Sequence, residues 1–214
     1  EMLRSLVGSE MCIRDRSYVL HMLKEKQLQR LRFPIGEITK SQVREMASSL
    51  SLQTAGKADS QDVCFISRTK GGRHRFLEER MVMTPGEVVD LQGKQIANVP
   101  AIQMVTIGQR KGLGVSGEGE PRYAVDVDIE SATVTAGSKR DLFCNETPIV
   151  NIQWVGDPVL GVIDIQTSAH GRTVKARVDE KIFWEHPHTK IAPGQSAVFY
   201  DDNKVVGSAI VSKS

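Results

Sequence analysis

The chain has 214 residues, 40% hydrophobic and 25% charged, which is typical of a folded protein of one or two domains. Its 28 Lys and Arg against 26 Asp and Glu leave a net charge of +2, which excludes a protein that coats nucleic acid with its whole surface. No apolar run is long enough for a membrane-spanning helix, and three scattered cysteines favour a reducing compartment, the cytoplasm, over a disulfide framework.

The first third of the chain has helical spacing. Leu20, Leu23, Leu28 and Leu31 share one helical face, which predicts a helix that ends before Pro34. Residues 39–42 read Thr-Lys-Ser-Gln, a capping box that predicts a second helix continuing to about residue 50. A third, short helix is expected around residues 76–80.

From residue 87 onward the hydrophobic period is two. Residues 123–130 and 174–179 alternate between apolar and polar, and residues 201–204 are typical of a hairpin turn. Several short strands at this spacing predict a small antiparallel barrel, with Trp154 and Trp184 in its core. We therefore expect an α+β protein.

The positive charge lies in the first half of the chain. Residues 1–120 have a net charge of +4 and residues 121–214 a net charge of −2. The densest cationic segment is residues 68–75, which include Arg68, Lys70 and Arg73. This segment either contacts an anionic partner or is a solvated basic loop.

Cys64 stands directly before this cationic segment and after the local turn or cap at Asp59 and Ser60. A thiol becomes a nucleophile or a sulfur carrier only as the thiolate, which nearby cations stabilise. We interpret Asp59 and Ser60 as shaping the loop around the thiol rather than moving protons. The alternative is a buried, inert cysteine that packs as a small hydrophobic residue.

A second candidate site lies at residues 106–114, Thr-Ile-Gly-Gln-Arg-Lys-Gly-Leu-Gly. Its glycines permit close backbone approach to a phosphate or ribose, and Arg110 and Lys111 supply positive charge. The segment is not a Walker motif, because no Gly-Lys-Ser/Thr ends it. A glycine-rich hairpin without a ligand is the alternative.

Five segments in order resemble the bacterial tRNA-specific 2-thiouridylases. The resemblance extends over essentially residues 17–214. The segments that carry it are Phe-Pro-Ile-Gly-Glu-Ile-Thr-Lys at 33–40, Asp-Ser-Gln-Asp-Val-Cys-Phe-Ile at 59–66, Pro-Gly-Glu-Val-Val-Asp at 85–90, the glycine-rich segment at 106–114, and Pro-Gly-Gln-Ser-Ala-Val-Phe-Tyr at 193–200.

The resemblance implies a reaction. Family members bind ATP through a Ser-Gly-Gly-x-Asp-Ser loop and adenylate the C2 oxygen of the wobble uridine of certain tRNAs. A cysteine of the Asp-Ser-x-x-x-Cys motif receives a persulfide sulfur from a sulfur-relay donor protein and delivers it to C2. By this match Cys64 is the persulfide-bearing residue, and a second cysteine of the N-terminal lobe forms a transient disulfide with it.

The chain departs from the family pattern in several places. No Ser-Gly-Gly-x-Asp-Ser loop occurs, and neither Cys12 nor Cys144 stands at the position of the second cysteine. Residues 1–16 resemble a translated sequencing adapter and are set aside as a non-native tail. At residues 166–171 the family commonly has an Arg that touches tRNA, whereas Ser168 stands here.

The resemblance also implies the domain order. We expect the tail at 1–16, the remnant of an α/β ATP-pyrophosphatase lobe with Cys64 at 17–67, a β-rich central module at 68–118 and a C-terminal antiparallel β-barrel at 119–214.

The function that follows is a tRNA sulfurtransferase fragment that is inactive alone because it lacks the ATP loop. The alternative is a non-catalytic tRNA-binding module with a structural cysteine. A thiol redox enzyme is disfavoured, since no resolving cysteine stands near Cys64 in the sequence. No metal site is expected. The residues expected to neutralise tRNA phosphates are Arg110, Lys111, Arg68, Lys70, Arg73, His170 and Arg172.

Overall fold

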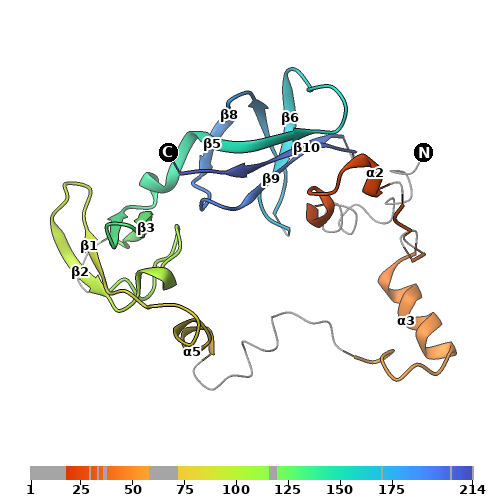
Figure 1. Ribbon diagram of the computed structural model, residues 1–214, viewed down its shortest axis with the longest axis horizontal. Helices are drawn as coiled ribbons and strands as arrows, with labels where there is room; N and C mark the ends of the chain where they lie inside the picture. The colour runs from red at the N-terminus through yellow and green to blue at the C-terminus, as the bar shows by residue number, and fades with distance from the viewer. Residues whose placement is uncertain are drawn as a thin grey trace. The chain divides into compact units, whose positions relative to one another are not determined.

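The computed structural model describes residues 18–28, 30–32, 34–35, 38–57, 72–115, 120–169, 171–202 and 204–213. It divides into two compact units (Figure 1). The first unit holds residues 1–58, 145–186 and 193–214, and the second holds residues 59–144 and 187–192.

Helices come first along the described chain and strands follow, so the predicted α+β class is confirmed. The helices are α2 (Glu25–Leu28), α3 (Lys40–Ser49) and α5 (Gly72–Glu78), with 3₁₀ turns η2 (Ile102–Met104) and η3 (Arg140–Leu142). The strands are β1 (Gly86–Val89), β2 (Gln95–Val99), β3 (Tyr123–Asp128), β4 (Thr133–Gly137), β5 (Phe143–Trp154), β6 (Val162–Gln166), β7 (Val174–Val178), β8 (Lys181–Thr189), β9 (Ser196–Asp201) and β10 (Lys204–Val211).

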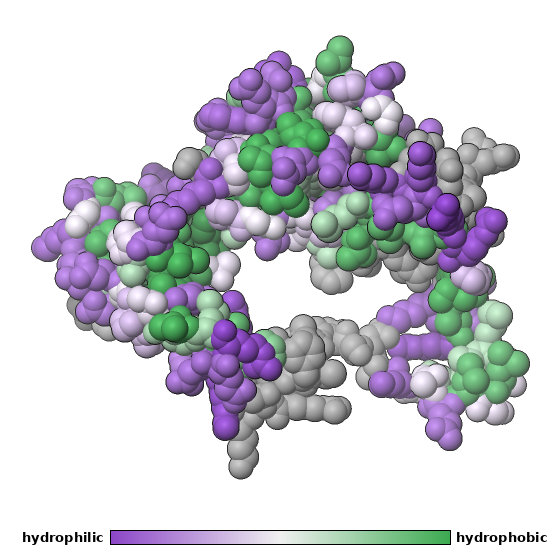
Figure 2. Space-filling model, viewed as in Figure 1, coloured by the Kyte–Doolittle hydropathy of each residue, from purple (hydrophilic) through white to green (hydrophobic). Residues whose placement is uncertain are grey.

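The capping box predicted for α3 is present. The Thr39 backbone N–H donates to Gln42 Oε1 at 2.8 Å, and the Gln42 N–H donates to Thr39 Oγ1 at 3.4 Å. Two donors that the first helical turn leaves unpaired are thereby satisfied. No residue of α3 is buried, and hydrophobic side chains such as Met46 lie at its surface (Figure 2).

The single helix predicted across Leu20 to Leu31 is wrong. Residues 18–20 are helical, a turn follows, and α2 begins separately at Glu25. The Gln27 side chain accepts a hydrogen bond from the Lys24 backbone N–H at 2.9 Å. This local cap starts a new helix where leucine spacing alone predicts a continuous one.

The second unit is built on a four-stranded sheet in the order β2-β1-β4-β3. β1 and β4 run parallel, and the outer strands are antiparallel to their neighbours. Its buried core is Val88, Val99, Ile102, Leu113, Ala124, Val134 and Ala136.

The predicted boundary between residues 118 and 119 divides this sheet. β4 pairs with β1, and β3 pairs with β4, so both strands belong to the second unit, called the central unit below. The sequence instead predicts that the barrel begins at residue 119. An isolated β1–β2 hairpin would be marginal, and two further strands give it a core. The alternation of apolar and polar residues predicts a strand at residues 123–128, but it does not predict which strand pairs with it.

The alternation expected in β3 is also imperfect. Ala124 and Val125 are both buried, and the pairing register with β4 shifts between Ala124 and Asp126. A bulge at this point places two consecutive side chains toward the interior.

The first unit contains a closed barrel in the order β10-β5-β8-β7-β6-β9, as the sequence predicts (Figure 1). Trp184 is buried and its Nε1 donates to Thr147 Oγ1 at 2.9 Å. Trp154 packs on Phe199 with ring centroids 5.2 Å apart. Both tryptophans thus serve the barrel, as expected.

The predicted hairpin turn joins β9 to β10. Asp201 pairs with Lys204, and Asp202 adopts a positive φ of 51°. A two-residue connection needs this left-handed conformation, which Asp tolerates better than most residues.

Candidate functional site

The structure describes four of the predicted site residues. Arg110 and Lys111 lie between η2 and β3, Arg73 lies in α5, and Arg172 lies between β6 and β7. The others lie outside the described residues, and they are Asp59, Ser60, Cys64, Arg68, Lys70 and His170.

The glycine-rich segment is organised by the side chain of Gln109. Its Oε1 accepts from the Thr106 N–H at 3.1 Å and its Nε2 donates to the Lys111 carbonyl at 2.8 Å. The backbone of the same segment bonds to the start of β3, from Gly108 N–H to the Ala124 carbonyl at 2.8 Å and from Ala124 N–H to the Gln109 carbonyl at 2.9 Å. The loop is therefore fixed at both sides of the two cations.

Two residues after Lys111 anchor the loop to the core. Leu113 is 2% exposed within the apolar core of the central unit. Gly114 has a φ of +70°, and a Cβ there would lie 2.7 Å from the Asn98 carbonyl oxygen. Only glycine permits both this conformation and this approach.

The loop presents its two cations to solvent. Arg110 and Lys111 are exposed, and no carboxylate of the described chain forms an ion pair with either. A fixed backbone carrying two unpaired cations can hold phosphate groups with little loss of backbone entropy on binding.

Part of the predicted basic loop at residues 68–75 is helical. α5 begins at Gly72, so Arg73, His74 and Arg75 are helical residues. Arg75 Nε lies 3.2 Å from Glu79 Oε1, an i,i+4 pair that compensates its charge. Arg73 is exposed and has no ion pair within the described ranges. Hydrophilic side chains cover this part of the surface (Figure 2).

Arg172 follows a loop that a buried glutamine organises. Gln166 is 1% exposed, and its Nε2 donates to the carbonyls of Ala169 and Gly171 at 3.2 and 3.1 Å. Its Oε1 accepts from the Tyr200 hydroxyl at 2.8 Å. The exposed Arg172 thus stands beside a loop tied to the barrel core. The role of Gln166 was not predicted from the sequence, although a polar residue in an apolar strand is a usable signal.

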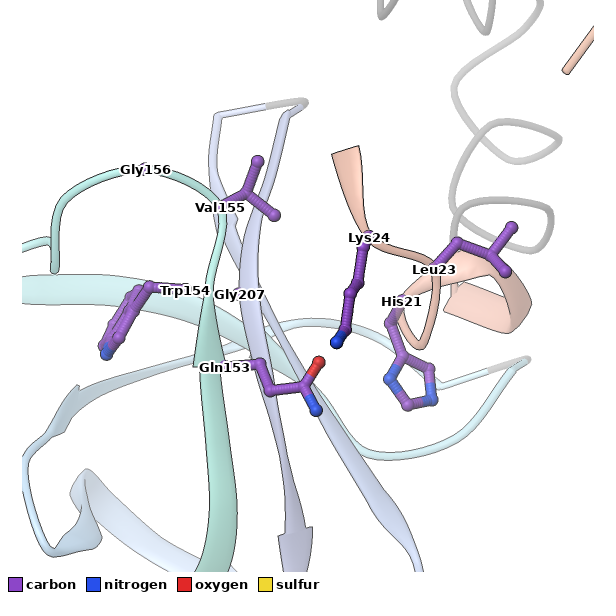
Figure 3. A pocket seen from close by; sticks show the side chains of 8 residues that line it. All are labelled: His21, Leu23, Lys24, Gln153, Trp154, Val155, Gly156 and Gly207. Atoms are coloured by element: carbon purple, nitrogen blue, oxygen red, sulfur yellow. The ribbon is translucent and has the colours of Figure 1, made fainter. Parts of the chain in front are cut away.

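A hollow of about 120 Å³ lies in the first unit (Figure 3). Its lining includes His21 and Lys24, whose side chains reach toward Gln153 of β5, together with Trp154 and Gly207. The Tyr18 hydroxyl donates to the Ser196 carbonyl at 3.0 Å. This contact attaches residues 18–24 to the strands of the barrel.

His21 is half-buried in this contact. Its Nδ1 is buried and has no hydrogen-bond partner among the described residues, and burial lowers the pKa of the ring. The burial of His21 was not predictable from local sequence, because it depends on a contact with residues more than 100 positions away.

Cys144, the one cysteine that the described ranges include, forms no disulfide. Its Sγ lies 3.4 Å from the His188 carbonyl. Across the described residues no group of three or more His, Cys, Asp or Glu could hold a metal ion, and no helix is long and apolar enough to cross a membrane.

Three family models match the chain in sequence order. A tRNA methyl transferase HUP domain matches residues 3–68, a tRNA methyl transferase PRC-barrel domain matches residues 74–138, and an aminomethyltransferase beta-barrel domain matches residues 149–211. The HUP match includes Cys64, and it begins within the segment that the sequence analysis set aside. The PRC-barrel match covers the four strands of the central sheet.

Curated relatives match nearly the whole chain. The tRNA-specific 2-thiouridylase MnmA of Chloroflexus aggregans is 37% identical over 209 residues, which covers 94% of this chain and 58% of the relative. The proteins of the same name from Zymomonas mobilis and Mycobacteroides abscessus are 35% and 36% identical, and 94% of this chain covers 55% and 60% of them. This chain therefore spans somewhat more than half the length of these relatives. With all three family domains present in order, the chain belongs to the tRNA-specific 2-thiouridylase family.

Proposed function

We propose that this chain is the part of a tRNA-uridine 2-sulfurtransferase that carries the sulfur and docks the tRNA. The observation that carries the proposal is the ordered match of three domains and of relatives named 2-thiouridylase across 94% of the chain. Cys64 lies within the HUP match, in the family's Asp-Ser-x-x-x-Cys motif. We expect the reaction to take place in the cytoplasm, where thiols stay reduced.

Cys64 acts first as an acceptor of sulfur. Its thiolate attacks the terminal sulfur of a donor persulfide, so that Cys64–S⁻ and R–S–SH give Cys64–S–SH and R–S⁻. A persulfide ionises more readily than a thiol and is a strong nucleophile. No metal or redox cofactor is required for this exchange.

The second step uses a uridine activated by ATP. Adenylation converts the C2 oxygen into a good leaving group, and the terminal sulfur attacks C2 while the bond to AMP breaks. A second thiolate then attacks Sγ of Cys64, which releases 2-thiouridine and leaves a disulfide. The ATP loop and the second cysteine of this scheme have no counterpart in the 214 residues.

The role of the cationic residues is to hold RNA. Arg110 and Lys111 on the fixed loop neutralise backbone phosphates, and Arg73 and Arg172 add to this charge. Arg68, Lys70 and His170, outside the described residues, contribute in the same way. Such contacts position RNA without reading its sequence, and they weaken with salt because bound counterions are released.

The chain alone is expected to form no 2-thiouridine when it is given tRNA, ATP and a persulfide donor. The experiment is nucleoside analysis of digested tRNA by mass spectrometry. Formation of 2-thiouridine would show that ATP binding does not need the missing loop and would overturn this part of the proposal.

The alternative, a non-catalytic tRNA-binding module, differs in the chemistry of Cys64. A sulfur carrier has a thiol pKa below about 8.5, the value of an ordinary thiol, and alkylates quickly at neutral pH. The rate of iodoacetamide labelling at Cys64 against pH measures this, with Cys12→Ser and Cys144→Ser removing the other thiols. A rate equal to that of a model thiol favours the binding module.

A further inference from the structure

A group of cations lies around η3 in the second unit, and none of them is among the residues assigned above. It comprises Arg122 before β3, Lys139 and Arg140 at η3, and Lys190 after β8. We propose that these four cations, together with the exposed ring of Phe143, form a second RNA-binding surface that holds backbone phosphates and stacks an unpaired base. That the RNA is a tRNA rests on the proposed function.

Hydrogen bonds fix Lys190 beside η3. Its backbone N–H donates to the Leu142 carbonyl at 2.7 Å, and its Nζ lies 3.5 Å from the Val125 carbonyl. A lysine ammonium has three donors, so two remain for an external acceptor. The two bonds bring three separate segments of the chain, at β3, η3 and β8, to one place.

Asp141 is the acidic residue within this group, and it is engaged by the turn itself. Its Oδ2 accepts from the Ser138 N–H and the Ser138 hydroxyl, each at 2.7 Å. These two bonds lower the pKa of Asp141, and the charges of Lys190 and Arg122 lower it further. The geometry agrees with this, because Tyr123 pairs with Gly137 at the β4 end of the turn and the Lys190 backbone bonds to Leu142.

The approach of Asp141 is built into the sequence. A Cβ on Gly137 would lie 2.9 Å from Asp141 Oδ2, so glycine is needed at the end of β4. Asp141 contributes one negative charge, against four positive charges on Arg122, Lys139, Arg140 and Lys190.

The cations remain available to a ligand. Arg122, Lys139 and Arg140 are exposed, and Lys190 is partly exposed. Within the part of the chain that the structure describes, none of the four forms an ion pair with a carboxylate. Such exposed cations gain most from a partner that brings many negative charges at regular spacing, which a phosphate backbone does.

The exposed ring of Phe143 favours RNA over an acidic protein as the partner of these cations. It begins β5 directly after η3 and is 44% exposed, although a phenylalanine is normally buried. Aromatic rings among cations form the stacking platforms of proteins that bind single-stranded nucleic acid. An unpaired base on Phe143 with its phosphates on the cations uses both features.

The test is tRNA binding by the full chain, measured by fluorescence anisotropy at several salt concentrations without ATP or a sulfur donor. The K139Q/R140Q variant should bind more weakly, and its log–log salt slope should fall by about 1.5, close to 0.7–0.9 per lost phosphate contact. F143L should weaken binding of a single-stranded oligonucleotide by about tenfold. The matched control is K94Q, which removes an exposed cation from the β1–β2 turn of the same sheet and should leave the slope unchanged.

Two results would overturn the proposal. One is a K139Q/R140Q variant with wild-type affinity and slope; the other is an equal loss in K94Q, which would show that only net charge matters. Competition by polyglutamate as strong as by RNA would point to an acidic protein and would also contradict it. The binding assay contains no sulfur donor, and sulfur uptake by Cys64 is measured separately, so failure of the sulfur-transfer proposal and failure of this surface are separately visible.

Discussion

The ring of His21 is held neutral by its surroundings. Burial lowers its pKa from the ordinary value of 6.5, and its Nδ1 has no hydrogen-bond partner among the described residues. Among the described side chains, Tyr18 and Lys24 lie beside the ring, and neither offers a negative charge at neutral pH. Burial therefore opposes the protonation of His21.

The sign of the pH effect follows from this direction. Above about pH 6.5 the ring is neutral in both the folded and the unfolded chain, so the contact has its full stability. As the pH falls further, the unfolded chain binds a proton that the folded chain refuses, and the free energy of unfolding decreases until the folded pKa is passed. We expect the attachment of residues 18–24 to loosen in acid.

Proton NMR titration of the histidine rings measures this directly. His21 should titrate below 6.5, and the protection factors of the amides of residues 18–24, which correct for the intrinsic pH dependence of exchange, should fall over the same pH range. In His21→Gln this fall should disappear. His188 is a second residue whose pKa burial lowers, with its Thr189 bond opposing, so His188→Gln separates the two contributions. A His21 pKa at or above 6.5 contradicts the buried, unpartnered ring.

Other single residues show what a pattern can reveal. Glycine spacing singled out the segment of Arg110 and Lys111, and the structure places both on a loop fixed by hydrogen bonds, while their contact with RNA stays a prediction. The residue that fixes this loop, Gln109, has no distinctive signal, since glutamine is common in exposed turns. Gln166 and His21 acquire their roles from tertiary contacts, which local spacing does not encode.

At the scale of elements, the loop between β6 and β7 depends on one buried network. Tyr200→Phe removes the hydroxyl that donates to Gln166 Oε1 at 2.8 Å and leaves a buried acceptor unpaired. The free energy of unfolding of the barrel should fall by about 1–3 kcal/mol. Urea unfolding followed by tryptophan fluorescence measures this loss.

Tyr200→Phe should also weaken tRNA binding at the surface loop between β6 and β7. Because Gln166 holds the carbonyls of Ala169 and Gly171, a looser Gln166 should weaken the contribution of Arg172 to tRNA binding. Tyr123→Phe, on β3 of the central sheet, is the matched control and should change neither property. Wild-type stability in Tyr200→Phe would show that the Gln166 network does not hold the loop.

Sequence patterns predicted best those elements whose stability depends only on neighbouring residues. The capping box of α3 and the two-residue turn between β9 and β10 each depend on a few neighbouring residues, and both are present. The interrupted first helix and the bulge in β3 were not anticipated. Leucine spacing says nothing of a side-chain cap at Gln27, and the register of β3 is set by its pairing with β4.

At the scale of the molecule, the sequence predicted the order of helices, central module and barrel. It did not predict that β3 and β4 complete the central sheet, because alternation has the same period in either setting. The parallel pairing of β1 with β4 joins strands more than 40 residues apart. Such contacts follow from the packing of a whole core rather than from any segment.

Under the proposed function, the sulfur carrier and the fixed cationic loop of Arg110 and Lys111 lie in different family matches. The HUP match holds Cys64, and the fixed cationic loop belongs to the PRC-barrel match. Loss of RNA contacts should therefore lower tRNA affinity while leaving sulfur loading intact, and loss of the thiol should do the reverse.

The most direct measurement is the site at which the protein takes up sulfur. The full chain is incubated with a low-molecular-weight persulfide, the product is digested, and the cysteine peptides are analysed by mass spectrometry. We predict one added sulfur atom on the Cys64 peptide, none on the Cys144 peptide and none at position 64 in Cys64→Ser. An unmodified Cys64 peptide, or sulfur distributed equally over all three cysteines, would contradict its assignment as the sulfur carrier.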